Sequence, residues 1–586
     1  LFTLETNGTL KTAATFDYES NASSYSIRVQ AKDEFNATVE GNFTVALLDL
    51  YELNYDKDSF QNTINNLPSL NVSEVFVSGN SSNLNLIGSI SIPNTLEVKI
   101  HSKGDLIISG SLSMNSEQDL ILEAGGDIYI NGGIFSKEDS GRLFLKFGLN
   151  STNENNPNDY FINSPVNLPD GQNLLIKQGK DGNLTTYTVL TELGVQNSLT
   201  GIDLQGVKGN LSANYALGAD LNASTTISWN GGSGFEPIGT ASTPFSGNFE
   251  GLGHTIENLH IQRTSIDKVA LFGRTFGSKI SNLGVVNANI RGKREVSALI
   301  ASSSNSLISR CFSSGTVNGA DENVAGLLAG IYGSTVINSY SHANATGTMF
   351  DVGGLGGELG SATIQNCYST GKPQGGSRVG GLVGVTFSAS QIQNSFWDKQ
   401  TSSRTTWGID YHGASSVAAI GLTTIEMKSQ TRFLNAGWDF NNTWVMPENH
   451  YPILRWQIRN SPPANLNSTA PLAFAENQPI GTIVGEFNAT DPDVNSTLTY
   501  HLVSGAGDGN NSLFTLETNG TLKTAITFDY ESNASNYAIR LQAKDEFNAT
   551  VEGNFTVTLT DIFENSVPTN LNSTASLTFA ENQAIG

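Results

Sequence analysis

The stretch LFTLETNGTLKTAATFDYESNASSYSIRVQAKDEFNATVEGNFTVALLD, residues 1–49, returns almost letter for letter at residues 513–561. Only six of the 49 positions differ between the two copies. Unrelated sequence separates the copies, so the block is a duplicated module of a modular array. We expect both ends of the chain to cut through a copy, and the chain to be a piece of a longer protein.

The duplicated module has the pattern of antiparallel β-strands. Apolar and polar residues alternate in YSIRVQAKD (25–33) and NFTVALLD (42–49), between Asn-Gly and Asp-Glu turns. The full copy runs from near Pro462 to near Asn565, which is long enough for a seven-strand sandwich. A further copy begins at Pro568, because SLTFAENQAIG (576–586) repeats PLAFAENQPIG (471–481).

The composition excludes several classes of protein. A chain of 586 residues is long enough for several domains. Its 54 acidic and 31 basic residues give a net charge of -23, which repels nucleic acid and anionic lipid and attracts divalent cations. The 60 glycines and the abundant Asn, Ser and Thr favour turn-rich β-structure. Two cysteines exclude a disulfide framework, and no apolar run is long enough to span a membrane.

A strict ladder of apolar residues runs through residues 269–400. One column has a spacing of 28 residues: Ile280, Ile308, Val336, Ile364 and Ile392. A second column keeps this period within one residue: Val269, Val296, Val324, Val352 and Val379. A repeat of this length without a helix signal predicts the coils of a parallel β-solenoid, which bury their apolar columns by stacking. The alternative is a set of unrelated hairpins. Short strands with Gly and Asn at their corners also follow one another over residues 71–148.

The ladder also places the two cysteines. The third residue after each member of the first column is Leu283, Cys311, Ser339, Cys367 or Ser395. Two rungs separate Cys311 from Cys367, or ~9 to 10 Å between α-carbons, which exceeds the ~7 Å limit for a disulfide. We therefore expect free thiols. The seven histidines form no metal-binding pattern, and we interpret them as surface residues.

A charged column stands directly before each ladder valine: Lys268, Glu295, Asn323, Asp351 and Arg378. We interpret it as an exposed charge ladder, in which Lys268 pairs with Glu295 and Asp351 with Arg378. The alternative is catalytic, because β-helices also carry polysaccharide lyases and glycosidases. Glu295 and Asp351 would then lie roughly 9 to 10 Å apart, near the outer limit for an inverting pair. No acid, base and electrophile converge in the sequence columns, so we expect no enzyme activity.

The rung motifs carry a resemblance to a known family. VGGLVG (379–384), AGLLAG (325–330) and VGGLGG (352–357) resemble the GLUG repeat of bacterial surface proteins. Residues 214–261 and 394–457 are similar to the segments that precede and close such repeats in filamentous-haemagglutinin-like adhesins. The resemblance is strong over 200–460 and weak over 71–200. It implies a right-handed parallel β-helix that is secreted to the cell surface.

The flanking modules resemble cadherin-like repeats, and the resemblance lies on acidic residues at strand ends and in turns. A hard calcium ion takes six to eight oxygen ligands, mostly carboxylates that converge from several loops. The cadherin pattern implies one ligand set at the lower end of the full module: Glu476, Asp529, Glu531, Asp561, Glu564 and Asn565. It implies a second set at the upper end, Asp491, Asp493 and Asp545, and the first copy supplies Asp17, Glu19 and Asp49.

The fit to the cadherin pattern has gaps. Phe563 stands where a linker Asn is expected, and Glu564 replaces an expected Asp. A cadherin-type site also needs the lower end of one module and the upper end of the next, and no junction within residues 1–586 is complete. We expect weak calcium binding by this chain and tighter binding in the intact array; the alternative is that these are solvated turn acids.

The sequence therefore predicts an all-β protein, a right-handed parallel β-helix flanked by Ig-like cadherin-type sandwiches. The expected parts are half a cadherin-like repeat (1–50), a haemagglutinin-like β-helix (51–230), a GLUG-repeat β-helix (231–400), its closing segment (401–460), a complete cadherin-like repeat (461–565) and the start of another (566–586). We expect an adhesin or stalk at the cell surface, whose calcium-stiffened modules accompany a β-helix that binds a glycan, a protein or another copy of itself. The alternative is a carbohydrate-active β-helix enzyme with cadherin-like accessory modules.

Overall fold

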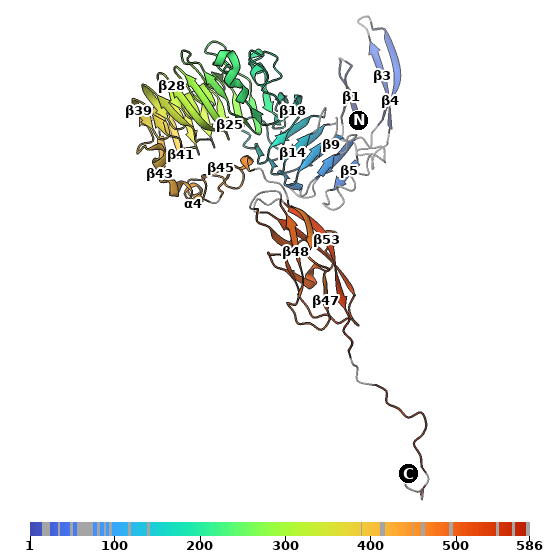
Figure 1. The fold of residues 1–586 in the computed structure, drawn as a ribbon. Helices are drawn as coiled ribbons and strands as arrows, with labels where there is room; N and C mark the ends of the chain where they lie inside the picture. The colour runs from blue at the N-terminus through green and yellow to red at the C-terminus, as the bar shows by residue number, and fades with distance from the viewer. Residues whose placement is uncertain are drawn as a thin grey trace. The chain divides into compact units, whose positions relative to one another are not determined.

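In the computed structural model the chain divides into two compact units, residues 1–460 and residues 461–586. The structure describes residues 1–6, 8–13, 24–32, 36–46, 51–54, 74–78, 83–86, 90–92, 97–114, 119–136, 141–387, 389–410, 416–447, 449–458, 463–491, 496–545, 550–564, 569–579 and 581. These residues are nearly all β-strands and turns, which confirms the predicted fold class (Figure 1). No helix in the described part of the chain is long and apolar enough to cross a membrane.

The described residues between 1 and 46 form two antiparallel strand pairs. The strands are β1 (Phe2–Leu4), β2 (Leu10–Thr12), β3 (Ser24–Lys32) and β4 (Thr38–Ala46). Their registers, Phe2 opposite Thr12 and Ser24 opposite Ala46, recur in the second copy, where Phe514 lies opposite Thr524 and Asn536 opposite Thr558. The duplicated sequence therefore adopts the same local pairing twice.

The first part of the solenoid has three parallel sheets, and each of four successive coils within residues 74–167 contributes one strand to each sheet. One sheet contains β5 (Tyr51–Asn54), β6 (Glu74–Ser78), β9 (Glu97–Ser102), β12 (Leu120–Ala124), β15 (Leu143–Phe147) and β18 (Gly171–Gln178). The second sheet contains β7 (Leu84–Leu86), β10 (Leu106–Ile108), β13 (Ile128–Ile130) and β16 (Tyr160–Ile162). The third sheet contains β8 (Ile90–Ile92), β11 (Leu112–Met114), β14 (Ile134–Ser136) and β17 (Val166–Asn167). Leu84, Leu106 and Ile128 stack directly and are buried, so each coil fills the core with aliphatic side chains.

The direction of the chain reverses once in the solenoid. Strand β18 pairs antiparallel with β19 (Thr185–Leu190), the only such pair among the described strands from β5 to β43. Parallel pairing then resumes through β20 (Tyr215–Leu217), β21 (Leu221–Asn222), β22 (Phe249–Glu257), β23 (His260–Gln262) and β25 (Lys279–Gly292). Two 3-10 helices, η2 (Gln205–Gly209) and η3 (Ser224–Gly232), lie in the intervening loops. The antiparallel pair β18/β19 is called the seam below.

From β25 onward the paired strands have the predicted period of 28 residues, within one residue for most pairs. In one sheet β25 is followed by β27 (Leu307–Ser309), β28 (Phe312–Gly319), β31 (Thr335–Ile337), β32 (Tyr340–Ser341), β33 (Asn344–Gly347), β36 (Thr363–Gln365), β37 (Tyr368–Ser369), β38 (Pro373–Gln374), β41 (Gln391–Asp398) and β43 (Ser416–Leu422). A second sheet contains β24 (Thr275–Phe276), β26 (Ile300–Ser304), β30 (Leu328–Tyr332), β35 (Gly356–Gly360), β40 (Val383–Thr386) and β42 (Ile409–Asp410). A third sheet contains β29 (Val324–Ala325), β34 (Phe350–Gly353) and β39 (Ser377–Gly380).

The apolar ladder is confirmed residue by residue. Ile280 pairs with Ile308, and the parallel pairing continues through Val336, Ile364 and Ile392, all of them buried. The valine column pairs in the same way from Val269 to Val379. The alternative of unrelated hairpins is wrong, because these neighbours are parallel.

The corners of the 28-residue coils use single residues with left-handed backbone. One column of corners is Asn282, Arg310, Asn338, Asn366 and Asn394, with φ between 48° and 54°. Asparagine tolerates this conformation better than most residues, because its short polar side chain can hydrogen-bond locally. The charged column from Lys268 to Arg378 forms a second set of such corners, also at positive φ.

A segment after the last coil covers one outer face of the solenoid. It contains α3 (Thr424–Met427), α4 (Gln430–Leu434), β44 (Trp444–Val445), β45 (Ile453–Leu454) and η4 (Arg455–Gln457), whereas the short helix α2 (Lys399–Ser402) lies earlier, between β41 and β42. Phe312, Tyr340 and Tyr368 on successive coils stack with ring centroids 5.1 and 4.8 Å apart, and Trp444 and Trp456 pack against this stack. Burial of these rings fixes the closing segment on the sheet.

Residues 461–586 contain a β-sandwich. One sheet has the order β46 (Ala464–Ser468), β48 (Ile483–Thr490), β51 (Thr521–Thr524) and β50 (Phe514–Leu516), and the other β47 (Ala473–Ala475), β53 (Thr550–Thr560), β52 (Asn536–Lys544) and β49 (Thr499–Leu502). A short 3-10 helix, η5 (Asn511–Leu513), precedes β50. Alternate residues of the strands, such as Ile539, Leu541 and Val557, fill the core between the sheets. This confirms the predicted sandwich.

Candidate functional site

The topology of the sandwich separates the predicted ligands into two groups. Asp529 and Glu531 precede β52, Glu476 follows β47, and Asp561 and Glu564 follow β53. Because β47 and β53 run parallel and both run antiparallel to β52, these five residues lie at one end of the module. Asp545 follows β52 and so lies at the opposite end of the module. Asp491 follows β48 at that end too, because Thr490, the last residue of β48, pairs with Ala464, the first residue of β46. The nine residues of β52 run from one end of the module to the other, so the two ends are about 30 Å apart at ~3.3 Å per residue.

Glu476 is the most firmly held residue of the site, and its side chain is fully buried. The Tyr530 backbone N–H donates to Glu476 Oε2 at 2.7 Å, and the Ile562 backbone N–H donates to Glu476 Oε1 at 2.9 Å. These two bonds, that from Tyr530 first, lower the pKa of the Glu476 carboxyl. Asn477 Nδ2 contacts both Glu476 and Glu564. The carboxylate therefore stays ionised and links the three loops that carry the predicted ligands.

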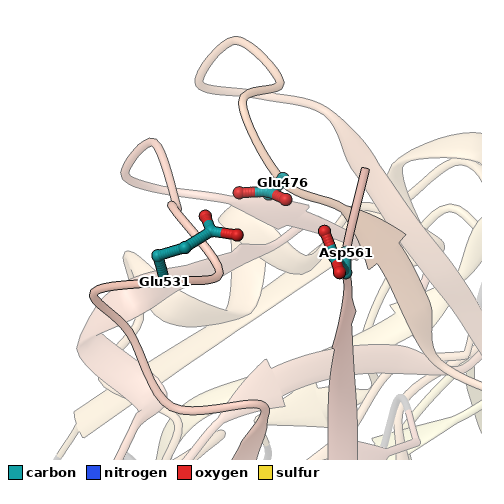
Figure 2. Close-up of side chains that lie close together, drawn as sticks. All are labelled: Glu476, Glu531 and Asp561. Atoms are coloured by element: carbon teal, nitrogen blue, oxygen red, sulfur yellow. The ribbon is translucent and has the colours of Figure 1, made fainter. Parts of the chain in front are cut away.

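Two further carboxylates converge on Glu476. Oxygen atoms of Glu476, Glu531 and Asp561 all lie within 4.8 Å of one another. Figure 2 shows Glu531 on a loop and Asp561 at the end of a strand, with the three carboxyl groups pointing toward a common centre. Glu531 and Asp561 are exposed to solvent, whereas Glu476 forms the floor. We call these three residues the carboxylate cluster.

The carboxylates of the cluster affect the pKa of Glu531. The hydrogen bond with its own backbone N–H lowers the pKa of Glu531. Four effects oppose this and together outweigh it: lost hydration, the charge of Glu476, the hydrogen bond with Asp529 and the charge of Asp561. The net pKa of Glu531 is therefore raised. Asp529 shows the opposite effect, because hydrogen bonds, that from the Ser532 side chain first, lower its pKa. Asp529 also accepts from the Glu531 backbone N–H at 3.1 Å and so shapes the loop.

The remaining predicted ligands fall into three groups. Asp545 is buried and Asp491 half-buried at the opposite end of the module. Glu564 is exposed beside the cluster and contacts Asn477. Five residues lie outside the described part of the chain: Asp17, Glu19, Asp49, Asp493 and Asn565. The backbone donors Tyr530 and Ile562 were not predicted, because a backbone N–H leaves no signal in residue type.

The charged column of the solenoid differs from the prediction in its exposure. Lys268 pairs with Glu295, and Arg378 Nε lies 2.7 Å from Asp351 Oδ1, so the predicted pairs are present. However, Glu295 and Asp351 are 7% and 2% exposed, and each forms its ion pair in this buried setting. The predicted exposed ladder is therefore wrong. Burial raises the pKa of Asp351 to about 7, against the lowering effect of Arg378.

The predictions for cysteines and histidines have opposite outcomes. Cys311 and Cys367 are free and buried, as predicted. In contrast, His254 and His260 are buried rather than on the surface. His254 Nε2 lies 2.9 Å from the Val166 carbonyl and Nδ1 3.3 Å from Asp220 Oδ1, so packing between neighbouring coils explains this histidine.

The sandwich that carries the carboxylate cluster matches the family model of the cadherin domain over residues 471–560. The match includes Glu476, Asp529 and Glu531 and ends directly before Asp561. The resemblance of the solenoid to GLUG-repeat and filamentous-haemagglutinin-like proteins stays a prediction.

Two curated proteins are similar to parts of the chain. Halomucin from Haloquadratum walsbyi is 39% identical over 166 residues, which are 25% of this chain and 2% of halomucin. Protocadherin Fat 4 from Homo sapiens is 40% identical over 91 residues, which are 15% of this chain and 2% of that protein. The chain thus spans about 2% of the length of either relative. The solved extracellular cadherin domains 1–4 of protocadherin gamma B7 are 23% identical over 17% of this chain and 25% of that chain, with a TM-score of 0.15.

Proposed function

We propose that this chain is a segment of an extracellular adhesion-type protein, in which the cadherin module binds calcium at one end and the solenoid presents a ligand-binding surface. The carboxylate cluster carries the proposal, because it places three acidic side chains on three separate loops within reach of one cation. The cadherin match and the similarity to halomucin and a protocadherin support a location outside the cell.

The chemistry of the cluster fits calcium. All the donors are carboxylate oxygens, which calcium prefers and which suit softer metals such as zinc less well. Glu476 is fixed by two backbone donors, whereas Glu531 and Asp561 stand on exposed positions from which they can adjust. Bound calcium supplies positive charge that offsets the repulsion between these carboxylates. The loops of Tyr530 and Ile562 would then be held together by Glu476 from one side and by the cation from the other.

The cluster alone is an incomplete site. Three carboxylates provide at most six oxygens, and both oxygens of Glu476 already accept a backbone hydrogen bond. Tight calcium sites use six to eight oxygens in full. We propose that a following module contributes the rest through residues equivalent to Asp491, Asp493 and Asp545. Calcium would then stiffen the junction between successive modules, and the array could hold the solenoid away from the cell surface.

Calcium titration of the chain tests this proposal. Glu531→Gln removes one charge from an exposed position and should weaken binding at least about fivefold without unfolding the module. Glu486→Gln is the matched control, because Glu486 is an exposed acid in the middle of β48, away from both ends. Equal binding by both variants would show that the cluster is not the calcium site.

For the solenoid we propose binding rather than catalysis. Each carboxylate of the predicted acid pair, Glu295 and Asp351, is buried beneath a cation of a neighbouring coil, Lys268 and Arg378. An acid and a base of a glycosidase must reach the substrate from opposite sides. We therefore expect no turnover of acidic or neutral polysaccharides. Turnover that Asp351→Asn abolishes would favour the alternative, a carbohydrate-active enzyme.

A further inference from the structure

A hollow of about 260 Å³ opens beside the seam of the solenoid. Its floor includes Tyr160 on β16 and Tyr187 on β19, both buried. Its rim includes Asn153, Gln178, Asn183 and the side chain of Lys279, the first residue of β25. Residues from both sides of the seam therefore line one cavity, which we call the seam pocket.

The reversal of the chain explains why the pocket lies here. In regular coils each corner stacks on the next, and the core is filled. At the seam the β18–β19 turn instead bends toward the loop that follows β15. The Lys180 backbone N–H donates to the Ser151 carbonyl at 2.9 Å, and the Asn153 backbone N–H donates to Asp181 Oδ1 at 2.6 Å. These bonds fix the walls, so the pocket is part of the fold.

The rim is polar and carries one positive charge. Gln178 Nε2 donates to the carbonyls of Asn156 and Asn158, at 3.1 and 2.8 Å, which fixes the orientation of its amide. Asn153 and Asn183 are exposed amides on the two loops that form the walls. None of the described residues that line the pocket is acidic, although the chain has a net charge of -23.

Lys279 is placed to receive an anion. Its Nζ lies 5.2 Å from the centroid of the Tyr160 ring and 3.8 Å from Asp159 Oδ1. That carboxylate has a closer partner, because Arg310 Nη2 lies 3.0 Å from Asp159 Oδ2. The Lys279 side chain, which is one-third exposed, can therefore move its ammonium group to a ligand without leaving Asp159 unpaired, and a charged donor makes a strong hydrogen bond with a carboxylate.

We infer that the seam pocket binds one acidic sugar residue of a glycan, with the sugar carboxylate at Lys279 and the ring hydroxyls on the amides of Gln178, Asn153 and Asn183. The volume is below the roughly 300 Å³ at which pockets for drug-sized ligands begin, so a single sugar fits better than an oligosaccharide. The amides of Asn153 and Asn183 can both donate to and accept from ring hydroxyls, whereas Gln178, whose Nε2 donates to two carbonyls, offers its Oε1 as an acceptor. This inference rests on the proposed binding role of the solenoid and specifies its ligand.

Calorimetric or NMR titration of the whole chain tests the inference with three probes. Methyl glucuronide carries the carboxylate and the ring, methyl glucoside only the ring, and acetate only the carboxylate. We expect methyl glucuronide to bind about tenfold more tightly than either of the others. Lys279→Gln should abolish this preference and leave the weak binding of methyl glucoside unchanged. Lys177→Gln is the matched control, because Lys177 Nζ donates to the Lys180 carbonyl and does not line the pocket.

Equal binding of methyl glucuronide and methyl glucoside, equal affinity after Lys279→Gln, or an equal loss in Lys177→Gln would each overturn the inference. If Lys279→Gln lowers the melting temperature, Asn183→Ala on the exposed turn serves instead, with an expected loss of severalfold in methyl glucuronide affinity. Calcium binding is measured on the same sample. Loss of sugar binding with calcium binding intact would reject the pocket while leaving the role proposed for the cadherin module in place.

Discussion

Arg310 joins the two parts of the solenoid, and its replacement gives a sharp test of the fold. Its Nη2 lies 3.0 Å from Asp159 Oδ2, and its Nε donates to Asn282 Oδ1 at 2.9 Å. The side chain of Arg310 is 8% exposed and that of Asp159 is 31% exposed. Arg310→Asn is the suitable change, because asparagine occupies this left-handed corner in the neighbouring coils and preserves the backbone.

The loss of stability in Arg310→Asn follows from the removal of the cation that pairs with Asp159. Breaking a buried ion pair by removing one partner costs about 3 to 5 kcal/mol, because a charge stays buried without its partner. Asp159 is partly exposed and keeps Lys279 at 3.8 Å, so we expect a smaller loss of about 2 to 3 kcal/mol. Burial alone raises the pKa of Asp159, but the charges of Arg310 and Lys279 lower it overall. The pair therefore contributes stability above the ordinary pKa of Asp159, and this contribution is lost as the pH falls through its lowered value.

Urea denaturation, monitored by a probe in residues 1–460, measures this loss. Arg294→Asn is the matched control, because Arg294 forms surface pairs with Asp321 and Glu322, at 3.8 and 3.1 Å, and should cost less than about 1 kcal/mol. The difference between wild type and Arg310→Asn should shrink in acid. Equal small losses in both variants, or a difference that does not depend on pH, would refute the reasoning.

Three further predictions concern the solenoid core. Burial lowers the pKa of His342 to about 4, so the unfolded chain takes up a proton at higher pH than the folded chain does. The free energy of unfolding should therefore fall between pH 6.5 and 4, by about 3 kcal/mol at most. His342→Gln should flatten that part of the pH profile of stability. Ile364→Ala empties a fully buried rung and should cost about 2 to 5 kcal/mol in urea denaturation, and a loss below 1 kcal/mol would contradict the ladder. Burial raises the pKa of the Cys311 and Cys367 thiols to about 12, so a thiol reagent should modify both only after unfolding.

The repeat of 28 residues was predictable because one rule, the stacking of buried aliphatic residues, acts on every coil. This stacking is the constraint that acts on Ile280 and on the equivalent residues of the following coils, so their period is regular. The aromatic column of Phe312, Tyr340 and Tyr368 has the same period. It was missed because its partners, such as Trp444 and Trp456, come from a segment with no repeat.

Other features depend on contacts between residues that are distant in sequence. The seam arises from one antiparallel pair, β18 with β19, and no periodic signal marks it. The burial of Glu295 and Asp351 depends on the packing around each corner, which residue type alone does not indicate. At the carboxylate cluster the acidic residues could be predicted from the cadherin pattern. The backbone donors of Tyr530 and Ile562, which hold Glu476, could not, because every residue except proline has the same N–H group.

Calcium binding by a longer protein, in which residues 1–586 lead into a complete second cadherin-like module, tests the central claim most directly. Isothermal titration calorimetry should give a dissociation constant of roughly 10⁻⁵ to 10⁻³ M, because the second module supplies the missing oxygens. Residues 1–586 alone should bind more weakly, and Glu531→Gln should weaken binding in the longer protein while Glu486→Gln should not. Equal affinity of the short and the long protein, or no calcium-dependent heat in either, would contradict the account.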